Sequence, residues 1–336
     1  MSKKGLSDFE QRIHDYWGWS NPEIGNSWVK GRRNTSLHKK IIAEAVEIFS
    51  FEEFKSFGVN GLGKGYNASE YFKAVGNGLL EKHIDYQIKK YVELTGGKIE
   101  DLIFPNVGAL IGRQDESIPE GSVIPVTAPR LAYYLDASTK FFESRHPEKT
   151  KIKTLEIGGG WGALSYLSKK NKENTEVYAI VDIPTSIAVA AYFLNEAGLS
   201  VALPNELEDL GYNHFSKVDC VFLETQQLES LPDNFFDISI STACLPELSK
   251  DLIGLYLKEM SRLSSVAYLD MTLEGRGKLA RGMIMDEKKR RGWLQENQCS
   301  DVKANPTPIT AYYPKWRPNC PEGEEVWEYY ITFSDE

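Results

Sequence analysis

The chain has 336 residues, of which 41% are hydrophobic and 12% aromatic, and its formal net charge is −9. This length allows one large domain or two modest ones with a sizeable core. The acidic balance argues against a broad phosphate-binding face, so we expect no nucleic acid partner. No stretch approaches the roughly 18 uninterrupted apolar residues of a membrane span, and the polar N-terminus does not resemble a signal peptide.

The cysteines lie far apart and form no C-x-x-C pair, at positions Cys220, Cys244, Cys299 and Cys320. This spacing indicates neither a disulfide framework nor a zinc ribbon. We therefore expect a cytoplasmic protein, in a reducing compartment.

Residues 1–125 are predicted to form a mostly helical region. Apolar side chains recur at helical spacing over Leu6–Trp19, and a second helix is expected after the cap at 34–36. A third helix is expected from about Ser69 to Leu94, followed by a long connection rich in proline and glycine. We expect this region to cap the remainder of the chain and to shape a substrate pocket.

Residues 126–336 alternate between β-type and helical runs, which is typical of an α/β domain with a doubly wound, mostly parallel sheet. The expected strands are 152–157, 177–181, 218–223, 236–241 and 265–271. The expected helices are 130–144, 162–170, 185–197, 248–263 and about 278–294. Two later β-type runs, 308–313 and 326–333, are interpreted as a terminal hairpin.

The first strand of this alternation ends in glycines, in the run Leu155-Glu-Ile-Gly-Gly-Gly-Trp-Gly162. Glycines permit positive φ and close backbone approach, and amides at a following helix N-terminus favour an oxygen-rich ligand. Gly158, Gly160 and Ala163 also satisfy the dinucleotide pattern G-x-G-x-x-G/A. Glu156 precedes these glycines, where its carboxylate would repel a pyrophosphate and suit a ligand that carries an ammonium and a sulfonium.

The same run resembles motif I of class I S-adenosylmethionine-dependent methyltransferases. The continuation Ile180-Val-Asp-Ile-Pro184 with Tyr192-Phe-Leu194 resembles the sugar O-methyltransferase group. This resemblance covers roughly residues 125–336. It implies a Rossmann-like sheet of seven strands closed by an antiparallel hairpin, S-adenosylmethionine as cofactor, and methyl transfer to a sugar hydroxyl. The acceptor would be either a glycan or a small molecule, and the small molecule would be a nucleotide sugar or a glycosylated natural product.

Candidate cofactor residues follow from the rule that open α/β sheets bind ligands at the carboxyl ends of their strands. Asp182 ends the second strand, 24 residues beyond Gly158, where it is placed to accept hydrogen bonds from two ribose hydroxyls. After the third strand, matching on Leu231-Pro232 assigns Gln227 to the adenine edge, where the family more often has an acid; Gln226 and Glu224 remain alternatives. The full predicted set is Glu156, Gly158, Gly159, Gly160, Trp161, Gly162, Asp182, Ile183 and Gln227.

The resemblance also implies that Thr242 and Glu247, which follow the fourth strand, serve the acceptor. A sugar hydroxyl is a poor nucleophile near neutral pH, so it needs a general base or a divalent ion. Glu247, Glu274 and the five histidines are the candidate bases, although Glu247 could instead cap the next helix. Asp270 with Glu274 could bind magnesium, but no sequence signature favours this, and we predict no metal.

Two other functions compete with methyl transfer. One is an NAD(P)-dependent oxidoreductase on a Rossmann-type domain, because the glycines also fit a dinucleotide. The other is a catalytically silent protein that binds an adenosyl ligand. The sequence leaves a homo-oligomer open.

Overall fold

The computed structural model describes residues 7–19, 79–107, 110, 112–171, 174–207, 212–272, 277–286, 301–309 and 326–333. The expected second helix and Glu274 lie outside these residues, as does the first part of the expected third helix. Among the described helices, none is both long and apolar enough to cross a bilayer.

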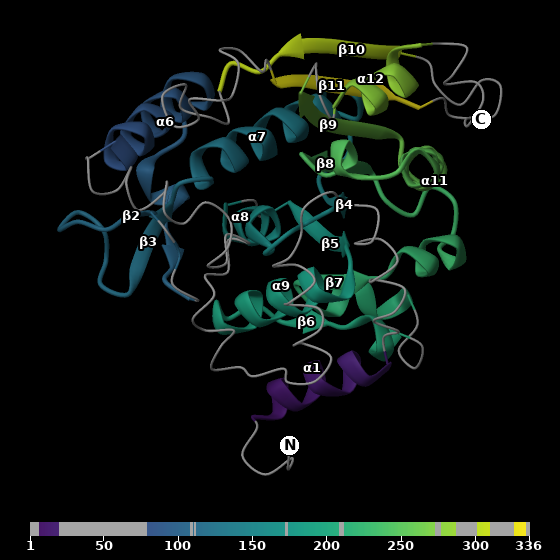
Figure 1. Ribbon diagram of the computed structural model, residues 1–336, viewed down its shortest axis with the longest axis horizontal. Coiled ribbons are helices and arrows are strands. Elements are labelled where there is room, and N and C mark those ends of the chain that lie inside the picture. The colour runs from purple at the N-terminus through teal and green to yellow at the C-terminus, as the bar shows by residue number, and fades with distance from the viewer. Residues whose placement is uncertain are drawn as a thin grey trace.

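An eight-stranded mixed sheet forms the centre of the protein, with the order β10-β11-β9-β8-β4-β5-β7-β6 (Figure 1). Its strands are β4 (Ile152–Ile157), β5 (Thr175–Val181), β6 (Val201–Ala202), β7 (Cys220–Leu223), β8 (Ile238–Thr242), β9 (Val266–Thr272), β10 (Asp301–Pro306) and β11 (Val326–Thr332). The six strands from β9 to β6 in this order all pair in parallel. Strand β11 runs antiparallel to both of its neighbours, β9 and β10. The predicted α/β fold with a mostly parallel sheet and an antiparallel hairpin is therefore confirmed.

Helices cover both faces of this sheet and bury separate apolar clusters. The chain's described α-helices are α1 (Asp8–Trp19), α6 (Leu79–Thr95), α7 (Ala128–Arg145), α8 (Ala163–Asn171), α9 (Pro184–Glu196), α11 (Lys250–Leu263) and α12 (Gly277–Met285). One cluster joins the sheet to α7, α8 and α9, and the other joins it to α11 and α12. Because both faces are covered, β4 is buried along nearly its whole length and ends where the glycines begin.

The N-terminal elements share the first of these clusters. Ile13 and Tyr16 of α1 and Ile84 of α6 are fully buried in it. Phe104 joins them from a small antiparallel sheet of β1 (Phe104–Pro105), β3 (Ser122–Pro125) and β2 (Gly112–Arg113). In Figure 1, α6 and α7 lie together on one side, and α1 lies beyond α9 near the β6 edge. The boundary at residues 125 and 126 remains a prediction.

Two strand predictions need correction. The sheet has eight strands rather than seven because the two-residue β6 pairs with β7 at the edge. The partner of β11 is Asp301–Pro306, not 308–313. Proline lacks the N–H that a ladder needs, and after Pro306 the chain turns, with the Thr307 hydroxyl bonded to the Ile309 carbonyl.

Strand register brings pairs of polar residues to the carboxyl edge of the sheet. Val181 lies opposite Leu223, so Asp182 and Glu224 follow adjacent strands at the same level. Thr242 lies opposite Asp270. This edge is where a doubly wound sheet places its ligand site.

Candidate functional site

The turn after β4 has the backbone geometry that only glycine adopts readily. Gly158, Gly160 and Gly162 have φ values of +82°, +56° and +83°. A Cβ added at Gly158 would approach the Cβ and Sγ of Cys244 closer than 3.0 Å, whereas one at Gly160 would meet nothing within 4 Å. Gly158 therefore packs against the loop after β8, and Gly160 faces open space.

Asp182 links this turn to the start of α9. Its Oδ2 accepts a hydrogen bond from the Gly160 N–H at 2.9 Å, and its Oδ1 accepts one from the Ile183 N–H at 2.7 Å. Ile183 is the residue before α9, which begins at Pro184. The structure thus brings four predicted cofactor residues, Gly158, Gly160, Asp182 and Ile183, to one corner of the carboxyl edge.

Glu156 lies within the sheet beneath this corner, not on its surface. Its side chain is 2% exposed, and its Oε2 accepts a hydrogen bond from the Tyr178 hydroxyl at 2.9 Å. Burial raises the pKa of Glu156 to about 8, although the Tyr178 hydrogen bond opposes this rise. The expected repulsion of a pyrophosphate assumed that Glu156 is ionised. Because the raised pKa favours the neutral carboxyl, this repulsion is weaker in the structure.

Trp161 lies in the core beside the turn. Its ring centroid is 5.4 Å from that of Phe104 and 4.8 Å from that of Phe193. These contacts hold the turn against α9 and the small sheet, so much of the indole surface is already covered.

The 3₁₀ turn η4 (Thr225–Ser230) follows β7 and uses the predicted adenine contact for its own structure. Gln227 accepts a hydrogen bond from the Glu224 N–H and donates one to the Pro204 carbonyl, each at 2.9 Å. Both ends of its amide are therefore engaged with backbone. The alternatives, Glu224 and Gln226, are hydrogen bonded to each other.

Helix α1 contributes to this half of the site, which sequence reasoning missed. The Tyr16 hydroxyl donates to Glu224 Oε1 at 3.1 Å, and the Tyr16 ring is fully buried. Arg12 donates to both carboxylate oxygens of Glu206 at 2.6 and 2.8 Å and to the Val201 carbonyl at 2.7 Å, which fixes α1 on the β6 segment. Tyr16 lies within the run Leu6–Trp19 that was predicted to be helical, but no local signal pairs it with a partner 208 residues away.

The acceptor-side candidates follow β8. Thr242 ends the strand and is half-buried, and Ala243 has a φ of +56° although it is not glycine. Glu247 is exposed on the short 3₁₀ turn η5 (Leu245–Glu247), which delays the predicted helix to Lys250. The structure therefore brings Thr242 and Glu247 to the loop that touches Gly158 through Cys244.

Asp270 lies under this loop and is 3% exposed. Its Oδ1 accepts the Ala243 N–H at 2.7 Å, and its Oδ2 accepts the Tyr134 hydroxyl at 2.8 Å. Burial raises the pKa of Asp270, while the charge of Arg130 and these hydrogen bonds lower it. Among the described residues, no group of three or more His, Cys, Asp or Glu side chains could hold a metal ion.

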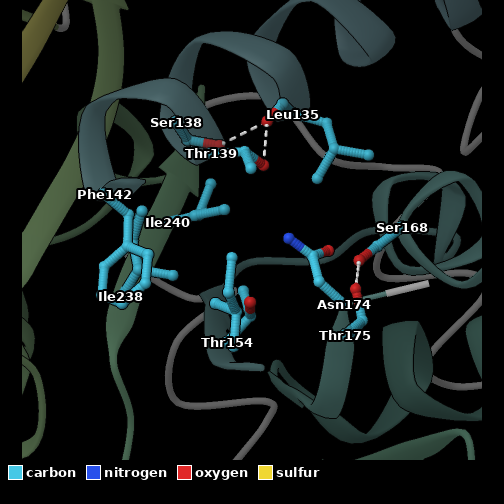
Figure 2. A pocket seen from close by; sticks show the side chains of 11 residues that line it. Leu135, Ser138, Thr139, Phe142, Thr154, Ser168, Asn174, Thr175, Ile238 and Ile240 are labelled. Carbon is cyan, nitrogen blue, oxygen red and sulfur yellow. Dashed lines mark hydrogen bonds between the residues drawn. The ribbon is translucent and has the colours of Figure 1, made fainter. Parts of the chain in front are cut away.

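A small cavity lies at the opposite end of the sheet, between α7, α8 and the amino ends of β4, β5 and β8 (Figure 2). Its polar groups already bond locally: the Ser138 and Thr139 hydroxyls donate to the Leu135 carbonyl, and Ser168 pairs with Thr175. It has room for about one water molecule. The carboxyl edge, with its glycine turn and polar residues, is therefore the candidate functional site.

No protein-family model matches the sequence, and no curated protein matches it. Solved structures with a similar fold include magnesium protoporphyrin IX methyltransferase from Synechocystis PCC 6803 with bound SAH. It is 13% identical, with a TM-score of 0.36, over 76% of this chain and 99% of that chain.

Two further structures cover a smaller share of this chain. Phosphoethanolamine N-methyltransferase 2 of Haemonchus contortus in complex with S-adenosyl-L-methionine is 12% identical over 60% of this chain and 52% of that chain, with a TM-score of 0.37. The bifunctional kinase-methyltransferase WbdD is 13% identical over 59% of this chain and 38% of that chain, with a TM-score of 0.37. All three are methyltransferases, and at these identities and TM-scores the likeness carries no conclusion about this chain.

Proposed function

We propose that this protein is an S-adenosylmethionine-dependent O-methyltransferase that methylates a sugar hydroxyl. The observation that carries the proposal is the antiparallel strand β11 between β9 and β10, in a sheet whose central glycine turn is bonded to Asp182. A dinucleotide-binding sheet continues with a parallel sixth strand in the order 3-2-1-4-5-6. The reversed strand is what the resemblance to class I methyltransferases implies, so it favours that function over an NAD(P)-dependent oxidoreductase.

The corner formed by the turn and Asp182 suits the adenosyl ligand. A carboxylate offers about four lone pairs, so Asp182 can keep its bonds to Gly160 and Ile183 and still accept two ribose hydroxyls. The open space at Gly160 lets a ligand approach the backbone closely. S-adenosylmethionine would supply the methyl group as an electrophile on its sulfonium.

The loop after β8 would serve the acceptor. Thr242 would orient the sugar hydroxyl by hydrogen bonding, and Glu247 would accept its proton as the methyl group is transferred. The exposure of Glu247 leaves its carboxylate accessible to a ligand at the carboxyl edge. The choice of a sugar rests on the resemblance of residues 180–194 to the sugar O-methyltransferase group.

Two measurements test this function. Calorimetry should detect binding of S-adenosylhomocysteine and no binding of NAD or NADP at the same concentrations. Transfer of a labelled methyl group from S-adenosylmethionine should then be detected with at least one member of a panel of glycans, nucleotide sugars and glycosylated natural products. Binding of NAD alone would overturn the proposal, and binding of S-adenosylhomocysteine without transfer would favour a silent ligand-binding protein.

A further inference from the structure

The loop between β8 and η5 contains a backbone conformation that an alanine does not adopt unaided. Ala243 has a φ of +56°, in the left-handed region where a Cβ crowds the backbone. Its side chain is exposed, so packing around the methyl group does not enforce the conformation. Something else in the structure must hold this residue in place.

The hold comes from Asp270 on the adjacent strand. The Ala243 N–H donates to Asp270 Oδ1 at 2.7 Å and also lies 3.3 Å from the Asp270 carbonyl oxygen. The carboxyl is itself fixed, because its second oxygen accepts the Tyr134 hydroxyl of α7 at 2.8 Å. Because the Asp270 carboxyl is buried and each of its two oxygens accepts a hydrogen bond, it is a rigid anchor for the amide of Ala243.

The conformation of Ala243 determines how this loop contacts the glycine turn after β4. The residue after Ala243 is Cys244, whose Cβ and Sγ fill the space where Gly158 would otherwise carry a side chain. The left-handed residue therefore aims the loop at the turn that follows β4. Beyond Cys244, the loop continues into η5 and Glu247.

We infer that Asp270 is a positioning residue, which holds the loop of residues 242–247 against the glycine turn and so aligns the acceptor with the transferred methyl group. The inference rests on the proposed function, because it takes this loop to carry the acceptor residues. Asp270 itself is too buried to contact an acceptor and acts through Ala243.

The test combines four variants whose turnover, KM for the acceptor and affinity for S-adenosylhomocysteine are compared. Asp270→Ala should lower kcat about 10- to 100-fold, while S-adenosylhomocysteine affinity changes less than about threefold, because misplacement of a reacting group mainly affects the chemical step. Adding Ala243→Gly to Asp270→Ala should restore at least part of kcat, since glycine adopts positive φ without an anchor. Ala243→Gly alone is the matched control, and Tyr134→Phe, which keeps the Ala243 bond, should lose less than Asp270→Ala.

A second approach leaves the core intact. Ala243→Val places a β-branched side chain at the left-handed position, on the surface, and should lower kcat in the presence of Asp270. If Asp270→Ala fails to fold, this variant decides the question. Normal turnover in Ala243→Val, or a folded Asp270→Ala whose kcat is normal or is not raised by Ala243→Gly, would overturn the inference.

Hydrogen exchange separates this inference from the proposed function. Exchange in residues 242–248 should be faster in Asp270→Ala and Ala243→Val than in the wild type, whichever ligand the protein binds. Faster exchange in a protein that binds no S-adenosylhomocysteine would retain the anchoring role and reject the function. Unchanged exchange in an active enzyme would reject the anchoring role alone.

Discussion

Removal of the Asp182 carboxylate should weaken cofactor binding more than any single substitution in the glycine turn to which Asp182 is bonded. The Asp182→Ala variant would lose two hydrogen bonds to ribose, and bonds to an ionised acceptor contribute about 1.5–3 kcal/mol each. The Gly160 and Ile183 amides, at 2.9 and 2.7 Å from the carboxylate, would lose their partner as well, with or without ligand. The loss of these two amide bonds affects the free and the ligand-bound protein alike and so partly cancels. We therefore expect the free energy of cofactor binding to weaken by about 2–4 kcal/mol.

Calorimetry with S-adenosylhomocysteine should therefore show a dissociation constant raised roughly 30- to 1,000-fold. Asp219→Ala is the matched control: this carboxylate also accepts a backbone N–H, from Ser200 at 2.9 Å, but at the amino end of β7. The affinity of the Asp219→Ala variant for S-adenosylhomocysteine should equal that of the wild type. Equal affinity in a folded Asp182→Ala variant would refute the assignment of the ribose site.

Glu247→Gln should lower turnover by about 10²- to 10⁴-fold with little change in S-adenosylhomocysteine affinity, because it removes the proton acceptor and keeps its shape; a wild-type enzyme inactivated by chelation and restored by magnesium would contradict this role. Glu156 has a pKa raised from 4.5 to about 8, so its contribution to stability is present below about pH 4.5 and is lost as the pH rises towards 8. Glu156→Gln should therefore flatten the change in melting temperature over this range, and parallel curves for the two proteins would contradict the shift. Gly158→Ala should destabilise the protein more than Gly160→Ala in denaturant titrations, because both suffer positive-φ strain, about 1–2 kcal/mol, but only Gly158 lies against Cys244. Saturating S-adenosylhomocysteine should slow hydrogen exchange in α1, because Tyr16 of α1 bonds to Glu224, which follows β7, the neighbour of the strand that ends before Asp182; identical exchange with and without ligand would show that α1 does not sense the site.

The central fold was predictable because its signals are local. The strand 152–157 was predicted to the residue, since a buried apolar run ends at glycines that require positive φ. The edge of the sheet was harder. A two-residue strand such as β6 has no periodicity, and the β10 segment Asp301–Pro306 is mostly exposed or half-buried, so it lacks the apolar run that marks the central strands.

The candidate site was predictable only in outline. The chain positions of Asp182 and Thr242 follow from strand ends, and strand ends can be inferred from sequence. The partners of these residues cannot. Gln227 matched a motif position, yet its amide closes its own turn and reaches Pro204, a contact that depends on how two loops meet. Hydrogen bonds between distant segments depend on the separation that the folded sheet gives them.

The two halves of the carboxyl edge are each fixed by a helix that precedes the sheet in the sequence. On the side proposed to bind adenosine, Tyr16 of α1 bonds to Glu224, and on the side proposed to bind the acceptor, Tyr134 of α7 bonds to Asp270. In each pair a buried tyrosine donates to a buried carboxyl group near the carboxyl end of a strand. Glu224 also accepts a hydrogen bond from Gln226 in the turn that follows it, and Asp270 accepts one from Ala243 in the loop after β8. A buried carboxyl is costly unless all its partners are present, so displacement of either helix would release the loop that its carboxyl holds. The helices before β4 therefore contribute to the geometry of the site as well as to the core.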